Sequence, residues 1–204
     1  MTTYSAKIIA DSVTEYGHRL TTMEVVFPRF ILPEINTHKI LSKSAASSRA
    51  RPSKKVIADV RANPFIPEEW GANRPGMQAT EMLGEVEQRI ARGVWVQSLN
   101  RALVTANELA ELGAHKQLVN RVLEPYMWHT SLITGTEWSN FFALRDHEDA
   151  QPEMRETARA MKAAYNNSTP TFKEVGEFHV PYTSNDEEFE TLWQRALASA
   201  ARCA

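Results

Sequence analysis

One short segment of the chain gathers side chains that are suited to binding an anion. Residues 34–52 (EINTHKILSKSAASSRARP) carry a histidine, several serines and the cations Lys39, Lys43, Arg49 and Arg51, with almost no acid. Hydroxyl groups and cations satisfy phosphate oxygens, lysine as a point charge and arginine through its planar fork. The segment therefore predicts a site for a small phosphorylated ligand.

Two other interpretations start from the same residues. The segment could be an amphipathic helix over 33–41 that ends in a solvated polar loop, or a basic patch that binds nucleic acid. The whole chain has 23 Lys and Arg against 25 Asp and Glu, which gives a net charge of -2. This balance offers no broad electrostatic footprint for a polyanion, so no nucleic-acid partner is expected.

Composition bounds the class of protein. With 204 residues, of which 43% are hydrophobic, residues 1–204 are expected to form a single domain with a core of its own. No apolar run is long enough for a membrane span and no signal peptide is recognisable, so a cytoplasmic protein without membrane contact is expected. Cys203 is the single cysteine. It permits no internal disulfide, and neither a metal site nor a thiol nucleophile is expected.

The elements that position the anion-binding segment can be predicted around it. Residues 6–11 and 19–27 are rich in Ile, Val and Thr and predict an N-terminal hairpin. A helix that starts at Pro28 or Pro33 would deliver His38 to its C-terminal end. Glu34 and His38 are four residues apart, so they would share one face and could meet the same ligand or bond to each other.

Residues 50–78 hold four of the ten prolines and predict a long loop anchored by Phe65 and Trp70. The loop is interpreted as an active-site cover that supplies backbone groups near residues 76–78, with a packed surface excursion as the alternative. Residues 79–112 follow as a long helix that Gly113 ends. Its apolar stripe is predicted to be core and comprises Met82, Val86, Ile90, Val94, Leu99, Leu103 and Ala106.

The remaining elements are predicted from shorter patterns. Residues 177–182 (EFHVPY) read as a weak strand, and residues 186–202 as an amphipathic terminal helix for packing or an oligomer contact. Residues 115–153 carry the second informative motif. It contains Arg121 four residues before a proline, Asn140 before a phenylalanine, Arg145 after a leucine, and then the run Ala-Gln-Pro-Glu.

Together the two segments resemble the flavin-dependent thymidylate synthases, the thymidylate synthase complementing proteins, of which this chain would be a divergent member. THKILSKSAASSR is similar to the family signature RHRxxSxxxxSxR and keeps its histidine, both serines and last arginine at His38, Ser42, Ser47 and Arg49. Lys39 retains the charge of the arginine that it replaces, whereas Thr37 does not. The chain also lacks the upstream His-Glu-Thr-Pro-Phe-like segment of many members, and Ala45 replaces a usual acid.

The resemblance implies an α/β (α+β) fold, in which the N-terminal hairpin and a small, mainly antiparallel sheet pack against long helices. It implies that FAD is bound by His38, Lys39, Ser42 and Asn140. It implies that a nucleotide is bound by Glu34, Ser47, Arg49, Arg121 and Arg145, with Ser47 and Arg49 as the catalytic residues. Asn120 competes with Arg121 for its position, because the spacing there is one residue longer than in the family.

The implied reaction is C5 methylation of a pyrimidine deoxynucleoside monophosphate, dUMP to dTMP. Methylene-tetrahydrofolate would donate the carbon, and reduced FAD, recharged by NADPH, would donate the hydride. The alternatives are methylation or hydroxymethylation of dCMP, and a non-catalytic nucleotide-binding homologue. Family members are homotetramers with shared active sites, so the same assembly is expected here.

Overall fold

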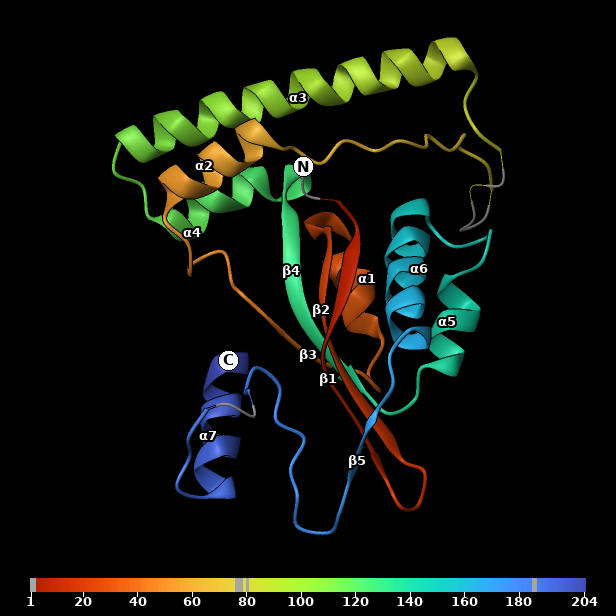
Figure 1. Cartoon of the computed structure of the whole chain (residues 1–204). Helices are drawn as coiled ribbons and strands as arrows, with labels where there is room; N and C mark the ends of the chain where they lie inside the picture. The colour runs from red at the N-terminus through yellow and green to blue at the C-terminus, as the bar shows by residue number, and fades with distance from the viewer. Residues whose placement is uncertain (1–2, 76–78, 80, 185–186) are drawn as a thin grey trace.

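The centre of the molecule is a mixed sheet whose strands run in the order β3-β4-β2-β1-β5 (Figure 1). The structure is a computed structural model that describes residues 3–75, 79, 81–184 and 187–204. The strands are β1 (Ser5–Thr14), β2 (Arg19–Pro28), β3 (Ser42–Ala45), β4 (Trp128–Gly135) and β5 (Thr171–Lys173). All neighbouring pairs are antiparallel except β1 and β5. The predicted α/β class with a mainly antiparallel sheet is confirmed.

The predicted N-terminal hairpin is present, and its strands are longer than expected. Gly17 has φ +80° in its turn, a conformation that glycine adopts without steric cost. Alternate residues of β2, namely Met23, Val25 and Phe27, are completely buried. This period of two places one face of the hairpin in the core.

Helices cover that buried face of the sheet. Helix α6 (Pro152–Asn166) packs on β1 and β2, α5 (Ser139–Arg145) packs on α6, and α1 (Leu32–Thr37) follows the short 3₁₀ helix η1 (Arg29–Ile31). Pro33 occupies the first turn of α1, where its missing N–H is not needed. This arrangement places the C-terminal end of α1 beside α5.

A second layer of helices forms a separate core at one end of the sheet (Figure 1). It consists of α2 (Ser53–Ala62), α3 (Glu85–Glu111), α4 (Lys116–Val119) and the 3₁₀ helix η2 (Asn120–Tyr126). The helix predicted over 79–112 is therefore present without a break, although it begins later, and Gly113 follows it with φ +79°.

The prediction that the whole stripe of this helix is core is wrong for its first half. Leu99, Leu103 and Ala106 are buried against α2 and η2. The exposed residues are Met82 (43%), Val86 (53%), Ile90 (61%) and Val94 (60%). The helix extends past the elements that cover its C-terminal half, so the chain itself leaves the N-terminal part of the stripe open (Figure 1).

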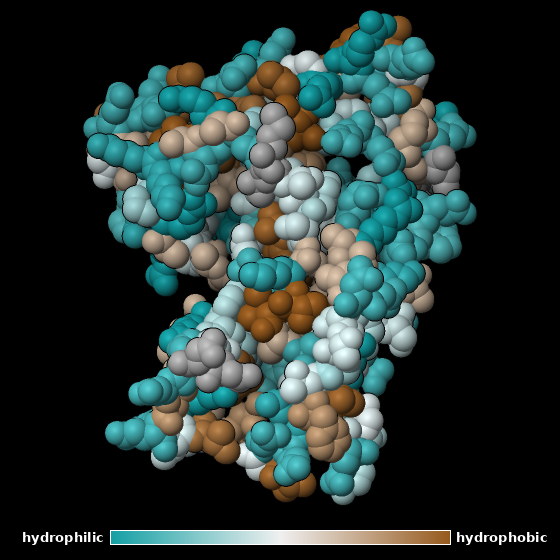
Figure 2. Space-filling view, in the orientation of Figure 1, coloured by the Kyte–Doolittle hydropathy of each residue, from teal (hydrophilic) through white to brown (hydrophobic). Residues whose placement is uncertain are grey.

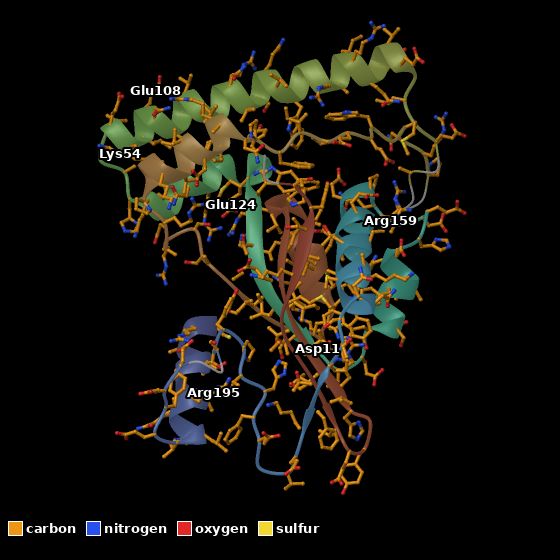
Figure 3. The ribbon with its side chains drawn as sticks, viewed as in Figure 1. Asp11, Lys54, Glu108, Glu124, Arg159 and Arg195 are labelled. Carbon is orange, nitrogen blue, oxygen red and sulfur yellow. The ribbon has the colours of Figure 1, made fainter. Side chains whose placement is uncertain are left out.

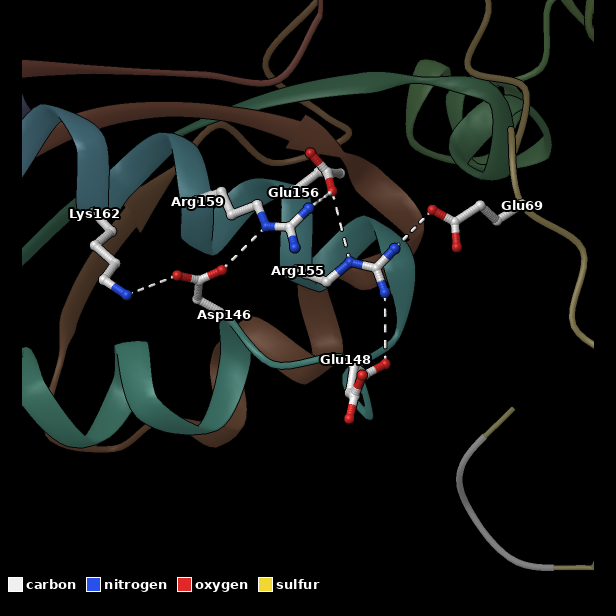
Figure 4. A network of polar contacts seen from close by, with 7 residues as sticks. All are labelled: Glu69, Asp146, Glu148, Arg155, Glu156, Arg159 and Lys162. Carbon is white, nitrogen blue, oxygen red and sulfur yellow. Dashed lines mark hydrogen bonds and ion pairs between the residues drawn. The ribbon is translucent and has the colours of Figure 1, made fainter. Parts of the chain in front are cut away.

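The long loop between α2 and α3 is attached to both helical layers. Phe65 is buried, and the Trp70 and Trp95 rings lie 6.0 Å apart. Arg155 on α6 forms an ion pair of 2.6 Å with Glu69 and belongs to a charged network along α6 (Figure 4). Residues 76–78, for which an active-site role is predicted, lie outside the described residues.

In the same network, Asp146 at the end of α5 accepts bonds from Arg159 (3.1 Å) and Lys162 (2.7 Å) on α6 (Figure 4). Bonds from these cations lower the pKa of Asp146. These exposed pairs individually contribute little stability, but they fix how α5 lies on α6.

After β5 the chain crosses the opposite face of the sheet and ends in α7 (Leu192–Cys203). The strand predicted over 177–182 is not present: this segment attaches through side chains. His179 bonds to Ser12 (2.8 Å) and Thr22 (2.9 Å), and the Tyr182 hydroxyl donates to Glu24 at 2.6 Å. Helix α7 begins at Leu192, later than predicted, because Thr191 and Gln194 form a capping box. Over the described residues, no helix combines the length and the apolar character that crossing a lipid bilayer requires.

Candidate active site

The second half of the anion-binding segment forms a turn, residues 46–51, at the open edge of β4. β3 pairs with β4 only over 131–134, and after Ala45 the chain leaves the sheet. The Asn120 side chain, 1% exposed, donates to the carbonyl oxygens of Ser48 (2.7 Å) and Arg51 (3.0 Å). Asn120 therefore holds the turn from its buried side.

Arg29, the first residue of η1 after the end of β2, holds the same turn from the other side. Its guanidinium donates to the Ser48 hydroxyl at 3.2 Å and to the Ala46 carbonyl oxygen at 3.4 Å, and its Nε lies 3.1 Å from Glu124 Oε1. The Ser48 hydroxyl in turn donates to Glu124. Figure 3 shows Glu124 between the helical layer and β4. This buried network fixes the backbone of the turn at several points.

His129 on β4 belongs to this network. Arg29 Nη1 lies 2.9 Å from His129 Nδ1, and a guanidinium can only donate, so Nδ1 accepts. Burial, and then the positive charge of Arg29, lowers the pKa of His129 to about 4. The imidazole is therefore neutral and carries its proton on Nε2. No described residue accepts a hydrogen bond from this Nε2–H.

The side chains of Ser47 and Arg49 take no part in the contacts of the turn with Arg29 and Asn120. Both are exposed, and the Ser47 hydroxyl accepts from the Arg49 backbone N–H at 3.3 Å. Within the described chain, the Arg49 guanidinium has no hydrogen bond or ion pair. The two residues predicted to be catalytic are thus held on a fixed backbone with their side chains free for a ligand.

The structure distinguishes Asn120 from Arg121, which compete for one predicted role. Asn120 is buried and serves the 46–51 turn, whereas the Arg121 side chain is 65% exposed and lies 4.0 Å from Glu124. Arg121 is in η2 rather than at the end of a long helix. Its role in binding the nucleotide stays a prediction.

The first half of the anion-binding segment forms a second group at the end of α1. Arg145 Nε donates to His38 Nε2 at 3.0 Å, and the His38 and Phe141 rings meet edge to face at 4.9 Å. Lys43 donates to the His38 carbonyl oxygen. Burial, followed by the charges of Arg145 and Lys43, lowers the pKa of His38. His38 and Arg145, predicted for cofactor and substrate respectively, therefore contact each other directly.

Four other residues predicted to bind the cofactor or the nucleotide are at the surface. Glu34, Lys39, Ser42 and Asn140 are exposed. Glu34 is on α1, four residues before His38, but among the described residues His38 Nε2 accepts from Arg145 and no bond joins His38 to Glu34. These exposed polar side chains are available to contact a polar ligand.

One short strand separates the two groups. β3 covers 42–45, and four strand residues span about 13 Å. Arg29, Glu124 and His129 were not predicted as site residues. A buried arginine network leaves no spacing signal, since its members come from η1, η2 and β4 and meet only in the folded chain.

Comparisons with known proteins agree with this fold. The family model described as thymidylate synthase complementing protein matches residues 9–171. The crystal structure of a UMP/dUMP methylase, PolB from Streptomyces cacaoi, bound with 5-Br UMP has a TM-score of 0.64 and 16% identity. The match covers 81% of this chain and 89% of that chain. The same enzyme bound with 5-Br dUMP gives a TM-score of 0.63 at 16% identity, over 81% and 90% of the two chains.

Thymidylate synthase X from Helicobacter pylori, with FAD and dUMP, aligns at a TM-score of 0.48 and 22% identity. This alignment covers 72% of this chain and 67% of that chain. No curated protein matches the sequence. The family match ends at residue 171, so the segment that carries α7 lies beyond it.

Proposed function

We propose a function from one premise: the chain belongs to the thymidylate synthase complementing protein family. It is a methyltransferase of the flavin-dependent thymidylate synthase type, and the family chemistry is methylation of a pyrimidine at C5. We propose that it converts dUMP to dTMP with methylene-tetrahydrofolate as carbon donor. NADPH would reduce the FAD that supplies the hydride.

The 46–51 turn is the observation that carries this proposal. Its backbone is fixed by Asn120 and Arg29, while Ser47 and Arg49 stay free. An arginine on a rigid backbone can clamp a phosphate or a ring oxygen with little loss of entropy. Orienting the nucleotide is the main task of the protein here, because the difficult chemistry belongs to the cofactors.

The group around His38 supports a flavin site. Lys39 and Lys43 supply positive charge for a pyrophosphate, and the exposed Ser42 and Asn140 offer a hydroxyl and an amide. The donor set thus suits FAD, although the upstream segment used by many family members is absent. When bound, reduced flavin supplies the hydride. His38 and Arg145, bonded to each other, would position the nucleotide beside it.

Charge develops on the pyrimidine carbonyl oxygen when C5 attacks the one-carbon donor. A cation held in advance near that oxygen stabilises the developing charge without reorganising during the reaction. Arg49 and Arg145 are the cations that we assign to this role and to the phosphate. Glu34 and Arg121 would border the nucleotide.

The proposal also specifies which base is methylated, uracil or cytosine. Uracil presents an N3–H donor and an O4 acceptor, whereas cytosine presents the reverse pattern, so a matched site rejects the other base. The exposed Glu34 carboxylate, where the family has Gln, favours dCMP as the second candidate because it can accept from the cytosine amine. Family chemistry favours dUMP.

Two measurements test the proposal. Purified protein should be yellow or should take up FAD stoichiometrically, as followed by visible absorption. Tritium should be released from C5-labelled dUMP, but not from labelled dCMP, in the presence of methylene-tetrahydrofolate, FAD and NADPH. Release from dCMP alone would replace the substrate and keep the chemistry. A protein that binds the nucleotide but neither takes up flavin nor releases tritium would be a non-catalytic homologue.

We also propose that the active enzyme is a homotetramer. The exposed residues Val86, Ile90 and Val94 on α3, with Met82 just before the helix, support this, since proteins rarely leave an apolar stripe of this length open to water. Contact between copies would also bring further side chains to the two groups around His38 and the 46–51 turn.

A further inference from the structure

A cavity of about 400 Å³ lies between the 46–51 turn, the start of α2 and the open edge of β4. Ser47, predicted to be catalytic, forms part of its wall. A second cavity of about 350 Å³ continues from it along α2 and shares Arg51, Val56 and Thr130 with it. The space-filling view shows the molecule hollowed on this side, between the helical layer and α7 (Figure 2). The hollow is large enough for part of a mononucleotide.

Three cations line the first cavity, and they differ in how they are paired. Arg29 is paired with Glu124 at 3.1 Å, and Arg51 is paired with Asp59. Lys55 is exposed, and its ammonium group has neither a hydrogen bond nor an ion pair to any residue that the structure describes. Lys55 therefore brings an uncompensated positive charge to the wall.

The position of Lys55 in α2 makes this charge unusual. The first turn of α2 contains Lys54 and Lys55 and no acidic residue. The N-terminus of a helix is the positive end of its dipole, where acids are favourable and cations are not. An anion bound in the cavity would remove this repulsion.

Four buried polar atoms of residues in this cavity wall lack a hydrogen-bond partner among the described residues. Two of them are Trp128 Nε1 and Arg29 Nε, of which the latter is in an ion pair with Glu124. The other two are His129 Nε2 and Asn120 Oδ1, in residues that are 6% and 1% exposed. The first is an N–H donor, because Arg29 occupies Nδ1, and the second is an acceptor, because the amide nitrogen donates to the turn. A nucleotide has both phosphate oxygens and sugar hydroxyls, so it could satisfy a donor and an acceptor together.

We infer that Lys55 is a further substrate-binding residue, and that this cavity receives the phosphate of the nucleotide with Lys55 as its cation. The inference rests on the proposed function, since it takes a nucleoside monophosphate as the ligand. Arg49 and Lys55 would then approach the nucleotide from two sides of the 46–51 turn. The exposed Arg51–Asp59 pair can exchange its partner at little cost.

The test compares Lys55→Gln with Lys54→Gln in the full chain. Lys54 is the matched control, because it lines a separate cavity between α2 and α3 with Asn107 and Glu111 (Figure 3). Calorimetry would measure the affinities for dUMP and for deoxyuridine, which lacks the phosphate. Lys55→Gln should weaken dUMP binding about 10- to 100-fold, the loss of one charge-assisted bond, and leave deoxyuridine unchanged. Lys54→Gln and Lys55→Arg should bind dUMP like the parent.

Each other outcome overturns a specific statement. If the parent binds dUMP and Lys55→Gln binds it equally well, Lys55 is not a phosphate ligand, while the proposed function stands. Equal loss of dUMP and deoxyuridine in Lys55→Gln would also exclude the phosphate role. If the parent binds neither UMP nor dUMP nor dCMP, the proposed function itself fails, and this inference fails with it.

Discussion

At the scale of single residues, the side chains of the site divide into those that hold the 46–51 turn in place and those that are exposed to a ligand. Ser48 and Asn120 are buried in the network that anchors the 46–51 turn, whereas Ser47 and Arg49 are exposed. Neighbouring residues of one motif thus serve opposite purposes. Removing a free residue should affect binding, and removing an anchoring residue should affect the turn.

Arg49→Ala tests whether the exposed residues of the 46–51 turn bind the ligand. We expect a loss of about 2 to 5 kcal/mol in the free energy of dUMP binding, because the phosphate or ring oxygen loses a charge-assisted partner. Thermal stability should change little, since the side chain is exposed. Calorimetry and a melting curve measure the two effects, with Arg89→Ala on the exposed face of α3 as control. Unchanged affinity for dUMP would show that the motif is placed wrongly.

His129 gives a prediction about pH. Its pKa is about 4 in the folded protein and about 6.5 in an unfolded chain, so folding favours the neutral form. Its contribution to stability is complete above pH 6.5 and is lost as the pH falls from 6.5 toward 4, by roughly 3 kcal/mol at most. His129→Gln should therefore lose less stability over this interval than the parent, as measured by urea unfolding. An identical pH dependence would contradict the buried, neutral state.

Sequence patterns predict the free residues better than the anchoring ones. Ser47 and Arg49 are singled out by their types and spacing, because hydroxyls and cations suit a phosphate ligand, and their roles stay predictions. The contact of Asn120 with Ser48 joins residues 72 positions apart, and Arg29 meets His129 across 100 positions. Such pairs have no local pattern and follow only from the strand order.

At the scale of elements, the periodic patterns are reliable for secondary structure and incomplete for burial. The hairpin and α3 occur where strand composition and helical spacing predict them. The stripe on α3 shows the limit, because periodicity identifies an apolar face but not the element that covers it. The prediction of a strand over 177–182 is wrong for a different reason. This segment has a strand-like composition, but it is attached to the sheet by side-chain hydrogen bonds of His179 and Tyr182 and not by strand pairing.

Asn120→Ala tests how the 46–51 turn is held to η2. The substitution leaves the carbonyl oxygens of Ser48 and Arg51 without their donor, at a cost of about 1 to 3 kcal/mol in folding free energy. Hydrogen exchange should increase in residues 46–51 and in the first turn of α2, and not in β1. Exchange that stays at the parent level in the turn would mean that Arg29 alone is sufficient.

At the scale of the whole molecule, the exposed half of α3 predicts how copies associate. Light scattering of the parent should give a mass close to four times the chain mass of 23.1 kDa. Ile90→Glu combined with Val94→Glu would bury carboxylates at the contact and should lower that mass. Arg92→Glu, on the opposite side of α3, is the control. A parent that is monomeric, or a double variant that keeps the parent mass, would exclude this interface.

The segment after β5 has a consequence for the order in which the protein is built. Thr22 and Glu24 bond to His179 and Tyr182, which are 157 and 158 positions later in the chain. During synthesis the hairpin leaves the ribosome long before these partners, so one face of β2 stays open to water and to chaperones until residues 179–182 emerge. Polar side chains on that face, such as Thr22 and Glu24, disfavour aggregation of the nascent sheet until this segment is synthesised.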